Sequence, residues 1–317
     1  MANARLSRYR WLVRGKDDRL RATWRVLIPV ALWLIILLIA SAVFRRLVAV
    51  LNITTSLSFG QFSVFLLYLP LILTLLVLTP RLDKRPLSDY GFDTSSPVIR
   101  YVLAGLGIGM LSSGIPAGIG LVLGYGTVSE AFVSGASDTV PVLIAAVIVG
   151  QLANVFLEEF LYRGVLIQNA AEGVSKWVGS RQASIFGSVV AISLLFGVSH
   201  VVFGGGGGVE GRSISLVISS ALLGAGWGTI YVLTGNLWLP MGAHFGYNIS
   251  NGMIFQPSYD TVLFQLPTVL KIGISEPAFW QLPRSFISAL AMIVLAIYWM
   301  YFERGEVNID DRVAQRI

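Results

Sequence analysis

Three short stretches of the 317-residue chain place polar side chains of catalytic type inside otherwise apolar sequence. The residues concerned are Glu158, Glu159, Arg163, His200, His244 and Asn248. A charged group at the centre of a membrane costs about 3 kcal/mol even on the lower experimental scale, so such residues are read as functional by default. The two histidines are the whole histidine content of the chain. The three stretches are therefore the candidate site.

Helical spacing separates the roles of these residues. Glu159 and Arg163 are four positions apart with the acid first, which is the favourable order for an ion pair on one helix face. Glu158 points about 100° away from Glu159 and is left as a spare carboxylate. His244 and Asn248 share a face of a second helix, because they are also four apart. The spacing predicts one neutralised structural pair and a free carboxylate that is available for catalysis.

The composition places these stretches in a membrane protein. The chain is 55% hydrophobic and 13% charged, with a mean hydropathy of +0.74, whereas soluble domains carry about 25% charged residues. The absence of cysteine excludes disulfides, thiolate zinc sites and cysteine nucleophiles. Most Lys and Arg residues behind the net charge of +6 flank apolar runs, which is the pattern that orients membrane helices. We therefore expect the lipid bilayer, and no nucleic acid, as the chain's surroundings.

Eight apolar segments are long enough to cross a bilayer. They cover about 26–44, 60–79, 98–124, 140–171, 183–203, 214–233, 238–256 and 283–302. A basic segment, 1–25, precedes this transmembrane domain of residues 26–302, and a polar tail, 303–317, follows it. The pattern predicts an all-α, polytopic membrane helix bundle of about eight transmembrane helices around a polar intramembrane cavity. An even number of spans and the distribution of Lys and Arg predict that both termini lie in the cytoplasm. The membrane is expected to be a bacterial inner membrane.

Three local features refine this organisation. Glycines recur through the third segment, at 105, 107, 109, 114 and 118, and small residues at four-residue spacing favour close helix packing in lipid. Glu172 to Gln182 is predicted to be a short polar loop, and residues 257–282 a mixed loop. Arg45 and Arg46 are predicted to lie outside the first span, on the side away from the termini.

The three motifs, taken together, resemble a known family. Glu-Glu-x-x-x-Arg at 158–163, Phe-x-x-x-His at 196–200 and His-x-x-x-Asn at 244–248 occur in this order, each in its own apolar segment. This arrangement is similar to the CPBP family, the CAAX-prenyl endopeptidase and bacteriocin-processing group of intramembrane proteases, also labelled Abi. The motifs cover about 150–250 within a CPBP-like core of about 98–256, and residues 85–92 are similar to a common cytoplasmic lead-in.

The resemblance implies roles for the site residues. Glu158 would activate the hydrolytic water with help from His200, while His244 and Asn248 would contact the developing oxyanion. Glu159 and Arg163 match the motif as supporting residues. Members of the family have been described both as metalloproteases and as glutamate-type proteases. The resemblance therefore leaves open a site without a metal and one in which zinc is held by Glu158, His200 and His244.

Elementary chemistry is compatible with both schemes. Peptide hydrolysis needs a base for water, donors for the oxyanion and an acid for the leaving amine, all of which these side chains can supply. Two histidines and a glutamate are also a zinc ligand set that leaves one position open. The sequence contains no His-Glu-x-x-His motif and none of the Gly-x-Gly-Asp or Gly-x-Ser-Gly motifs of other intramembrane proteases.

The leading hypothesis is an intramembrane endopeptidase acting on a membrane-associated peptide or protein. Prenylated substrates are not expected in a bacterial membrane, so CAAX processing itself is not assigned from the sequence. The alternative is a non-catalytic relative that serves as a membrane scaffold or bacteriocin-immunity protein. A proton-coupled transporter would also use buried Glu and His, but the chain shows no internal repeat of the kind common in transporters.

Overall fold

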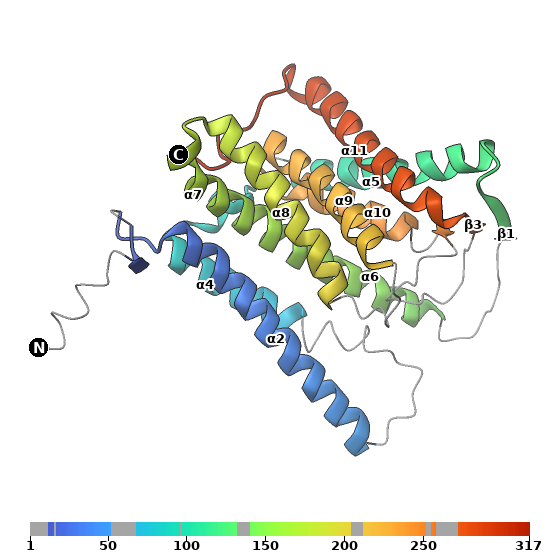
Figure 1. Ribbon diagram of the computed structural model, residues 1–317, viewed down its shortest axis with the longest axis horizontal. Coiled ribbons are helices and arrows are strands. Elements are labelled where there is room, and N and C mark those ends of the chain that lie inside the picture. The colour runs from blue at the N-terminus through green and yellow to red at the C-terminus, as the bar shows by residue number, and fades with distance from the viewer. Residues whose placement is uncertain are drawn as a thin grey trace, which may run out of the picture.

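The computed structural model describes residues 12–15, 17–51, 68–95, 97–131, 140–203, 212–251, 255–257 and 272–317. These residues form a bundle of long helices that is confirmed as all-α and of membrane type (Figure 1). The α-helices are α2 (Ala22–Leu51), α4 (Leu69–Asp83), α5 (Val98–Val122), α6 (Val140–Glu158), α7 (Gln168–Val178), α8 (Arg181–Phe203), α9 (Arg212–Thr234), α10 (Trp238–Ile249) and α11 (Gln281–Arg304). The short helices are η2 (Leu87–Tyr90), η3 (Glu159–Ile167) and η5 (Ala278–Trp280).

Five described helices are long and apolar enough to cross a membrane. They contain the candidate spans Ala22–Ala40, Val98–Val122, Arg181–Val201, Ile214–Thr234 and Ala278–Arg304. The other predicted segments also contain helix, although α10 has 12 residues and residues 60–67 lie outside the described part of the chain. Arg45 and Arg46 lie within α2, which continues to Leu51, but beyond the candidate span Ala22–Ala40, as expected of residues outside the first span.

Three short strands at one end of the bundle were not predicted. They are β1 (Thr127–Ala131), β2 (Phe255–Pro257) and β3 (Ile272–Ser275), and β3 lies between the other two. β1 pairs with β3 antiparallel and β2 pairs with it in parallel. The predicted seventh helix, 238–256, is therefore too long, because α10 ends at Ile249 and Phe255 is already in a strand.

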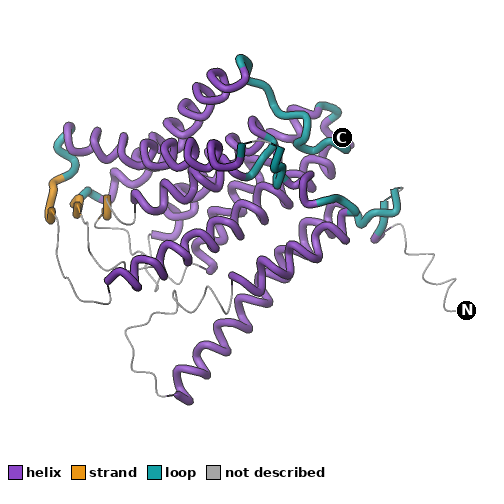
Figure 2. The backbone as a smooth tube through the Cα atoms, turned by 180° about the vertical axis from the view of Figure 1, so that it is seen from behind, coloured by secondary structure: helices purple, strands orange, loops and turns teal. Residues whose placement is uncertain are grey.

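Both ends of the described chain meet at the end of the bundle opposite the strands (Figure 2). The Lys84 side chain lies 3.2 Å from a carboxylate oxygen of Asp18, and the Lys84 carbonyl accepts a hydrogen bond of 3.1 Å from Arg316. Residues near the two termini thus contact one and the same residue. This arrangement agrees with an even number of membrane crossings, and the cytoplasmic location of that end stays a prediction.

Helices α5 and α10 pack backbone to backbone, and α10 carries His244. A Cβ atom at Gly105 would lie 2.3 Å from the Leu239 carbonyl oxygen, and one at Gly109 would lie 2.0 Å from that of Ala243. The matching glycines of α10 are Gly242 and Gly246, where a Cβ would lie 2.3 Å from carbonyl oxygens of α5. The expectation of close packing is confirmed for 105 and 109, whereas nothing lies within 4 Å of a Cβ at 107 or 118.

The predicted loop at 172–182 is wrong, because α6, η3 and α7 follow one another directly and stay helical to Val178. Glu172 is buried and is surrounded by guanidinium groups. Its carboxylate lies 2.9 Å from Arg25 Nη1 and 3.3 Å from Arg19 Nη1, and it also pairs with Arg85. A carboxylate can be buried only when it is paired in this way. Arg19 and Arg25 of the basic N-terminal region are therefore part of the protein interior.

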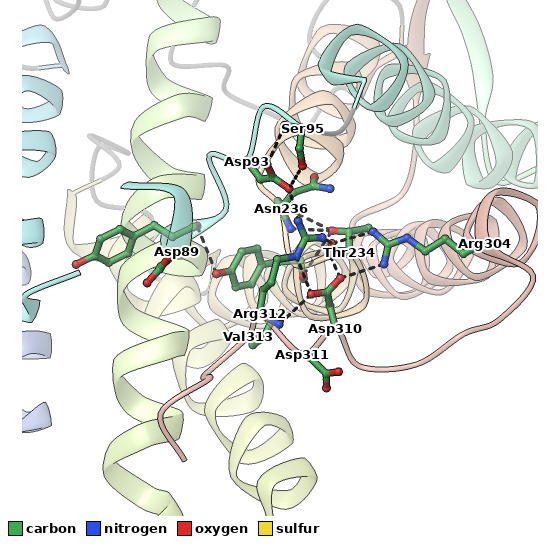
Figure 3. A network of polar contacts seen from close by, with 12 residues as sticks. Asp89, Asp93, Ser95, Thr234, Asn236, Arg304, Asp310, Asp311, Arg312 and Val313 are labelled. Atoms are coloured by element: carbon green, nitrogen blue, oxygen red, sulfur yellow. Dashed lines mark hydrogen bonds and ion pairs between the residues drawn. The ribbon is translucent and has the colours of Figure 1, made fainter. Parts of the chain in front are cut away.

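The C-terminal tail folds back onto the turn between α9 and α10 (Figure 3). Arg312 donates to the Thr234 carbonyl at 2.7 Å and lies 2.6 Å from Asp93. Arg304 donates to the same carbonyl at 3.1 Å and pairs with Asp310 at 3.0 Å. The tail thus holds the turn from which α10 begins.

Candidate active site

Glu158 ends α6 and Glu159 begins η3, a π-helix that runs to Ile167. π-helical turns are rare and occur frequently at functional sites. The expected ion pair is confirmed, with Arg163 Nη1 3.1 Å from Glu159 Oε1 and both side chains buried. Regular α-helix was expected here, and nothing in the local sequence signals the wider turn.

Glu159 also binds His244, which the sequence interpretation did not foresee. Its Oε1 atom lies 2.8 Å from His244 Nδ1. The other ring nitrogen of His244, Nε2, lies 3.6 Å from Glu158 Oε2. Residues from two distant segments are thus joined through one imidazole, with Glu159 on one side and Glu158 on the other. Glu159 is a shared partner of the Arg163 guanidinium and the His244 imidazole and not only half of an isolated pair.

His200 reaches the same region from α8. Its Nδ1 atom lies 2.8 Å from the Phe196 carbonyl oxygen, one helical turn earlier, and its ring packs on the Phe196 ring at 4.4 Å. The Phe196 ring is in turn 6.3 Å from the His244 ring. Phe196 therefore lies in contact with both histidines. Within the described residues no hydrogen bond joins His200 to Glu158.

Asn248 contacts a residue that the sequence interpretation missed. Its side-chain amide donates to Gln151 Oε1 at 3.2 Å, and both residues are half-buried. Gln151 lies on α6, two helical turns before Glu158. A glutamine inside an apolar run was the available signal, because polar side chains are expensive there. His244 and Asn248 both lie on α10, as predicted.

Aromatic side chains enclose the charged groups. Trp227 of α9 stacks on His244 with ring centroids 3.8 Å apart, and the Arg163 guanidinium lies 4.7 Å from the centre of the Phe196 ring. Tyr162 is buried and donates to Ser199 Oγ at 2.9 Å. The stacking of Trp227 was not predicted, although Gly224 and Gly228 on either side of it indicate close packing.

The site lies at membrane depth. Trp33, which is near the middle of the candidate span Ala22–Ala40, packs edge-on against Tyr162 at 6.3 Å. Tyr162 is in the same helical turn as Glu158 and Glu159. Groups at this depth are shielded from bulk water, so their contacts are stronger than similar contacts at a surface. The polar cavity expected around them stays a prediction.

The sequence left open a zinc ion held by Glu158, His200 and His244. The described part of the chain contains no cluster of three or more His, Asp or Glu side chains able to hold a metal ion. The Nδ1 atoms of His200 and His244 contact the Phe196 carbonyl and Glu159, which leaves Nε2 as the nitrogen of each ring that would face a metal. Zinc binding by Glu158, His200 and His244 stays a prediction, and we derive no step through a metal.

These features define an integral membrane protein with an acid–histidine site inside its helix bundle. Residues 140–250 match the family model described as Type II CAAX prenyl endopeptidase Rce1-like. This match supports a membrane protease of the CPBP family, and the matched stretch contains all three motifs. Comparisons with curated proteins and with solved structures find no match.

Proposed function

We propose that the chain is an intramembrane endopeptidase in which Glu158 activates the hydrolytic water. One observation carries the proposal. Glu158 Oε2 makes no hydrogen bond within the described residues and lies 3.6 Å from Nε2 of His244, whose other nitrogen is held by Glu159. A carboxylate oxygen without a hydrogen-bond partner, beside an oriented imidazole, is the pairing of base and donor that hydrolysis needs.

In the proposed reaction, Glu158 takes a proton from water as the water oxygen attacks the carbonyl carbon of the scissile bond. The carbonyl oxygen becomes an oxyanion and accepts hydrogen bonds from His244 Nε2 and from the amide of Asn248. The tetrahedral intermediate then breaks at its C–N bond, and Glu158 returns the proton to the leaving amine. His200 Nε2 is the atom through which His200 would hold the water, because its Nδ1 contacts a backbone carbonyl.

The proposal requires a proton on both ring nitrogens of His244. With His244 protonated on both nitrogens, the imidazole donates to Glu159 from Nδ1 and to the oxyanion from Nε2. The two carboxylates of Glu158 and Glu159 then face two cations, His244 and Arg163. A neutral group of four is the arrangement that a low-dielectric interior tolerates best.

The substrate of this reaction is a membrane-associated peptide or protein, because the site lies at the level of the middle of a membrane span. The matched family is described by its action on CAAX prenyl substrates. Peptides ending in a CAAX sequence, with and without a prenyl group, are therefore the first substrates to test. Cleavage of only the unprenylated or of unrelated membrane peptides would favour the bacterial assignment made from the sequence.

The test is cleavage by the purified full-length protein in liposomes, with products identified by mass spectrometry. Glu158→Gln and His200→Ala should each lower the cleavage rate by roughly 10²- to 10⁴-fold, the range for loss of a general acid–base group. Glu306→Gln, which changes an exposed carboxylate of the tail, serves as the control. Unchanged rates in both site variants would rule out the proposal, and a phenotype in cells that survives both substitutions would favour a scaffold.

A further inference from the structure

Trp227 covers one face of the His244 imidazole, and we propose that it is a positioning residue for this catalytic group. The inference rests on the function proposed above, in which His244 donates to the oxyanion from Nε2. The two ring centroids lie 3.8 Å apart and the ring planes differ by 19°. Such a stacked arrangement restricts the plane of the smaller ring in a way that a general apolar contact does not.

The hydrogen bond to Glu159 is not sufficient to orient His244. It holds one atom, Nδ1, at 2.8 Å from the carboxylate. The imidazole can still swing about that bond, and each swing moves Nε2, the atom that lies 3.6 Å from Glu158. The flat face of Trp227 blocks this motion. The hydrogen bond and the stack together fix where Nε2 points.

Trp227 can act in this way because it is itself held in place. Its side chain is only 2% exposed. Phe196 and Tyr247 meet its ring edge-on at 6.0 Å and 5.9 Å, and the Arg163 guanidinium lies 5.5 Å from its centre. Gly224, one turn earlier, lets Phe196 approach, since a Cβ there would lie 3.0 Å from the Phe196 ring. The indole therefore has little freedom to adapt if His244 moves.

A residue that only fills space would behave differently on substitution. Trp227→Leu fills part of the same volume without a flat ring, whereas Trp227→Phe keeps a smaller flat ring. If Trp227 positions His244, Trp227→Phe should keep part of the His244 orientation and activity that Trp227→Leu loses. Trp299→Leu is the matched control, because it makes the same substitution on another helix. Trp299 is on α11 and packs on Tyr101 with ring centroids 4.8 Å apart.

The histidine count makes a direct measurement possible. The chain has two histidines, so NMR of full-length protein labelled with ¹⁵N-histidine contains two imidazole signal sets, and His244→Gln assigns them. We expect the ring protons of His244 in the wild-type protein to be shifted upfield by the indole ring current, relative to those of His200. Trp227→Leu should abolish this upfield shift and average the two ¹⁵N signals of the His244 ring. Trp227→Phe should keep part of the shift and part of the difference between the ¹⁵N signals. Trp299→Leu should leave the shift and the ¹⁵N signals of His244 unchanged.

Kinetics supply the second readout. Trp227→Leu should lower kcat by roughly 10- to 100-fold, because small misplacements of a catalytic group are costly, and should leave KM within about threefold, because substrate binding is not its role. The proposal is overturned if the ring protons of His244 show no upfield shift in the wild-type protein. It is also overturned if the Trp227→Leu variant has the same His244 signals and the same kcat as the wild-type protein. If Trp227→Leu does not fold, the upfield shift of His244 in the wild-type protein and the His244 signals of Trp227→Phe test the proposal. A protein with the expected spectra that cleaves no peptide would overturn the proposed function and leave the positioning of His244 intact.

Discussion

At the scale of single residues, the carboxylate with the most charged contacts in the site is Glu159 and not Glu158, which the sequence left unpaired. Its Oε1 atom is 3.1 Å from Arg163 and 2.8 Å from His244. Arg163 also donates to the Gly224 carbonyl at 3.2 Å, which ties η3 to α9. A supporting residue in the motif thus connects three helices through two charged contacts.

We predict that the Glu159–Arg163 pair is strongly coupled. Glu159→Gln or Arg163→Met should each lower the free energy of unfolding by about 3 kcal/mol or more, because Glu159→Gln leaves the buried Arg163 without a carboxylate and Arg163→Met removes one of the two partners of the buried Glu159. The double variant should lose at least ~1 kcal/mol less than the sum of the two single losses. The measurement is equilibrium unfolding in detergent micelles.

The exposed ion pair between Arg14 and Asp18 provides the comparison. Breaking it should cost less than about 1 kcal/mol, as is usual for pairs in contact with water. Strictly additive losses at 159 and 163 would contradict the role given to the buried pair.

At the scale of helices, the position of His244 depends on how closely α10 can approach α5. Gly105 and Gly109 face Gly242 and Gly246, and every one of these positions excludes a Cβ atom. Close backbone contact replaces side-chain interdigitation, as expected for helix association in lipid. His244 directly follows Ala243, whose backbone forms part of this contact.

Gly109→Ala should therefore displace α10 and reduce both stability and cleavage. The new methyl group would lie 2.0 Å from the Ala243 carbonyl oxygen and 2.6 Å from the Tyr247 nitrogen, and backbone atoms cannot move aside as flexible side chains can. We expect a loss of about 2 kcal/mol or more of unfolding free energy, by analogy with overpacked cores, and a matching loss of cleavage rate.

Gly107→Ala is the matched control on the same helix, since nothing lies within 4 Å of a Cβ there. It should be neutral or stabilise the protein by up to about 1 kcal/mol through helix propensity. Equal effects of the two alanines on unfolding would show that the α5–α10 contact is looser than the structure indicates.

At the scale of the whole molecule, the two ends of the chain close the bundle at one side. Arg19 and Arg25 bind Glu172 of α7, and Arg304 and Arg312 bind the carbonyl of Thr234. The contacts of Arg19 and Arg25 hold α7, which continues the helix that carries Glu158. The contacts of Arg304 and Arg312 hold the turn from which α10, the helix of His244, begins. The site is thus supported by segments that resemble simple flanking tails in the sequence.

Docking of the tail should depend on pH. Burial alone would raise the pKa of Asp310, but its hydrogen bonds to Arg312 and Arg304 and the charge of Arg312 hold that pKa below its usual value of 3.8. A carboxylate with a lowered pKa stabilises the folded state at pH values above its usual range, and this contribution is lost as pH falls through the folded-state pKa. The tail should be docked at neutral pH and should detach below about pH 4.

Hydrogen exchange of residues 304–317 as a function of pH measures this docking. Asp310→Asn should lower protection at neutral pH by roughly tenfold or more, as for the loss of a charged hydrogen bond. Asp311→Asn is the control, because the Asp311 carboxylate is fully exposed and lies 3.8 Å from Arg181. Equal protection in wild type and Asp310→Asn at neutral pH would contradict the prediction.

What the sequence by itself determined depends on local spacing and composition. Apolar run length and the scarcity of charge were enough for the membrane bundle and most helix positions. The four-residue spacing was enough for the Glu159–Arg163 pair. These features are set by neighbours along one helix, so periodicity shows them.

Only the tertiary structure decided which distant residues meet. The contacts of His244 with Glu159 and Trp227 join separate segments, as does that of Asn248 with Gln151. A helical pattern shows which face a side chain occupies but not which helix lies opposite it. Glu172 resembled a loop residue for the same reason, because the three arginines that allow its burial come from parts of the chain far from it.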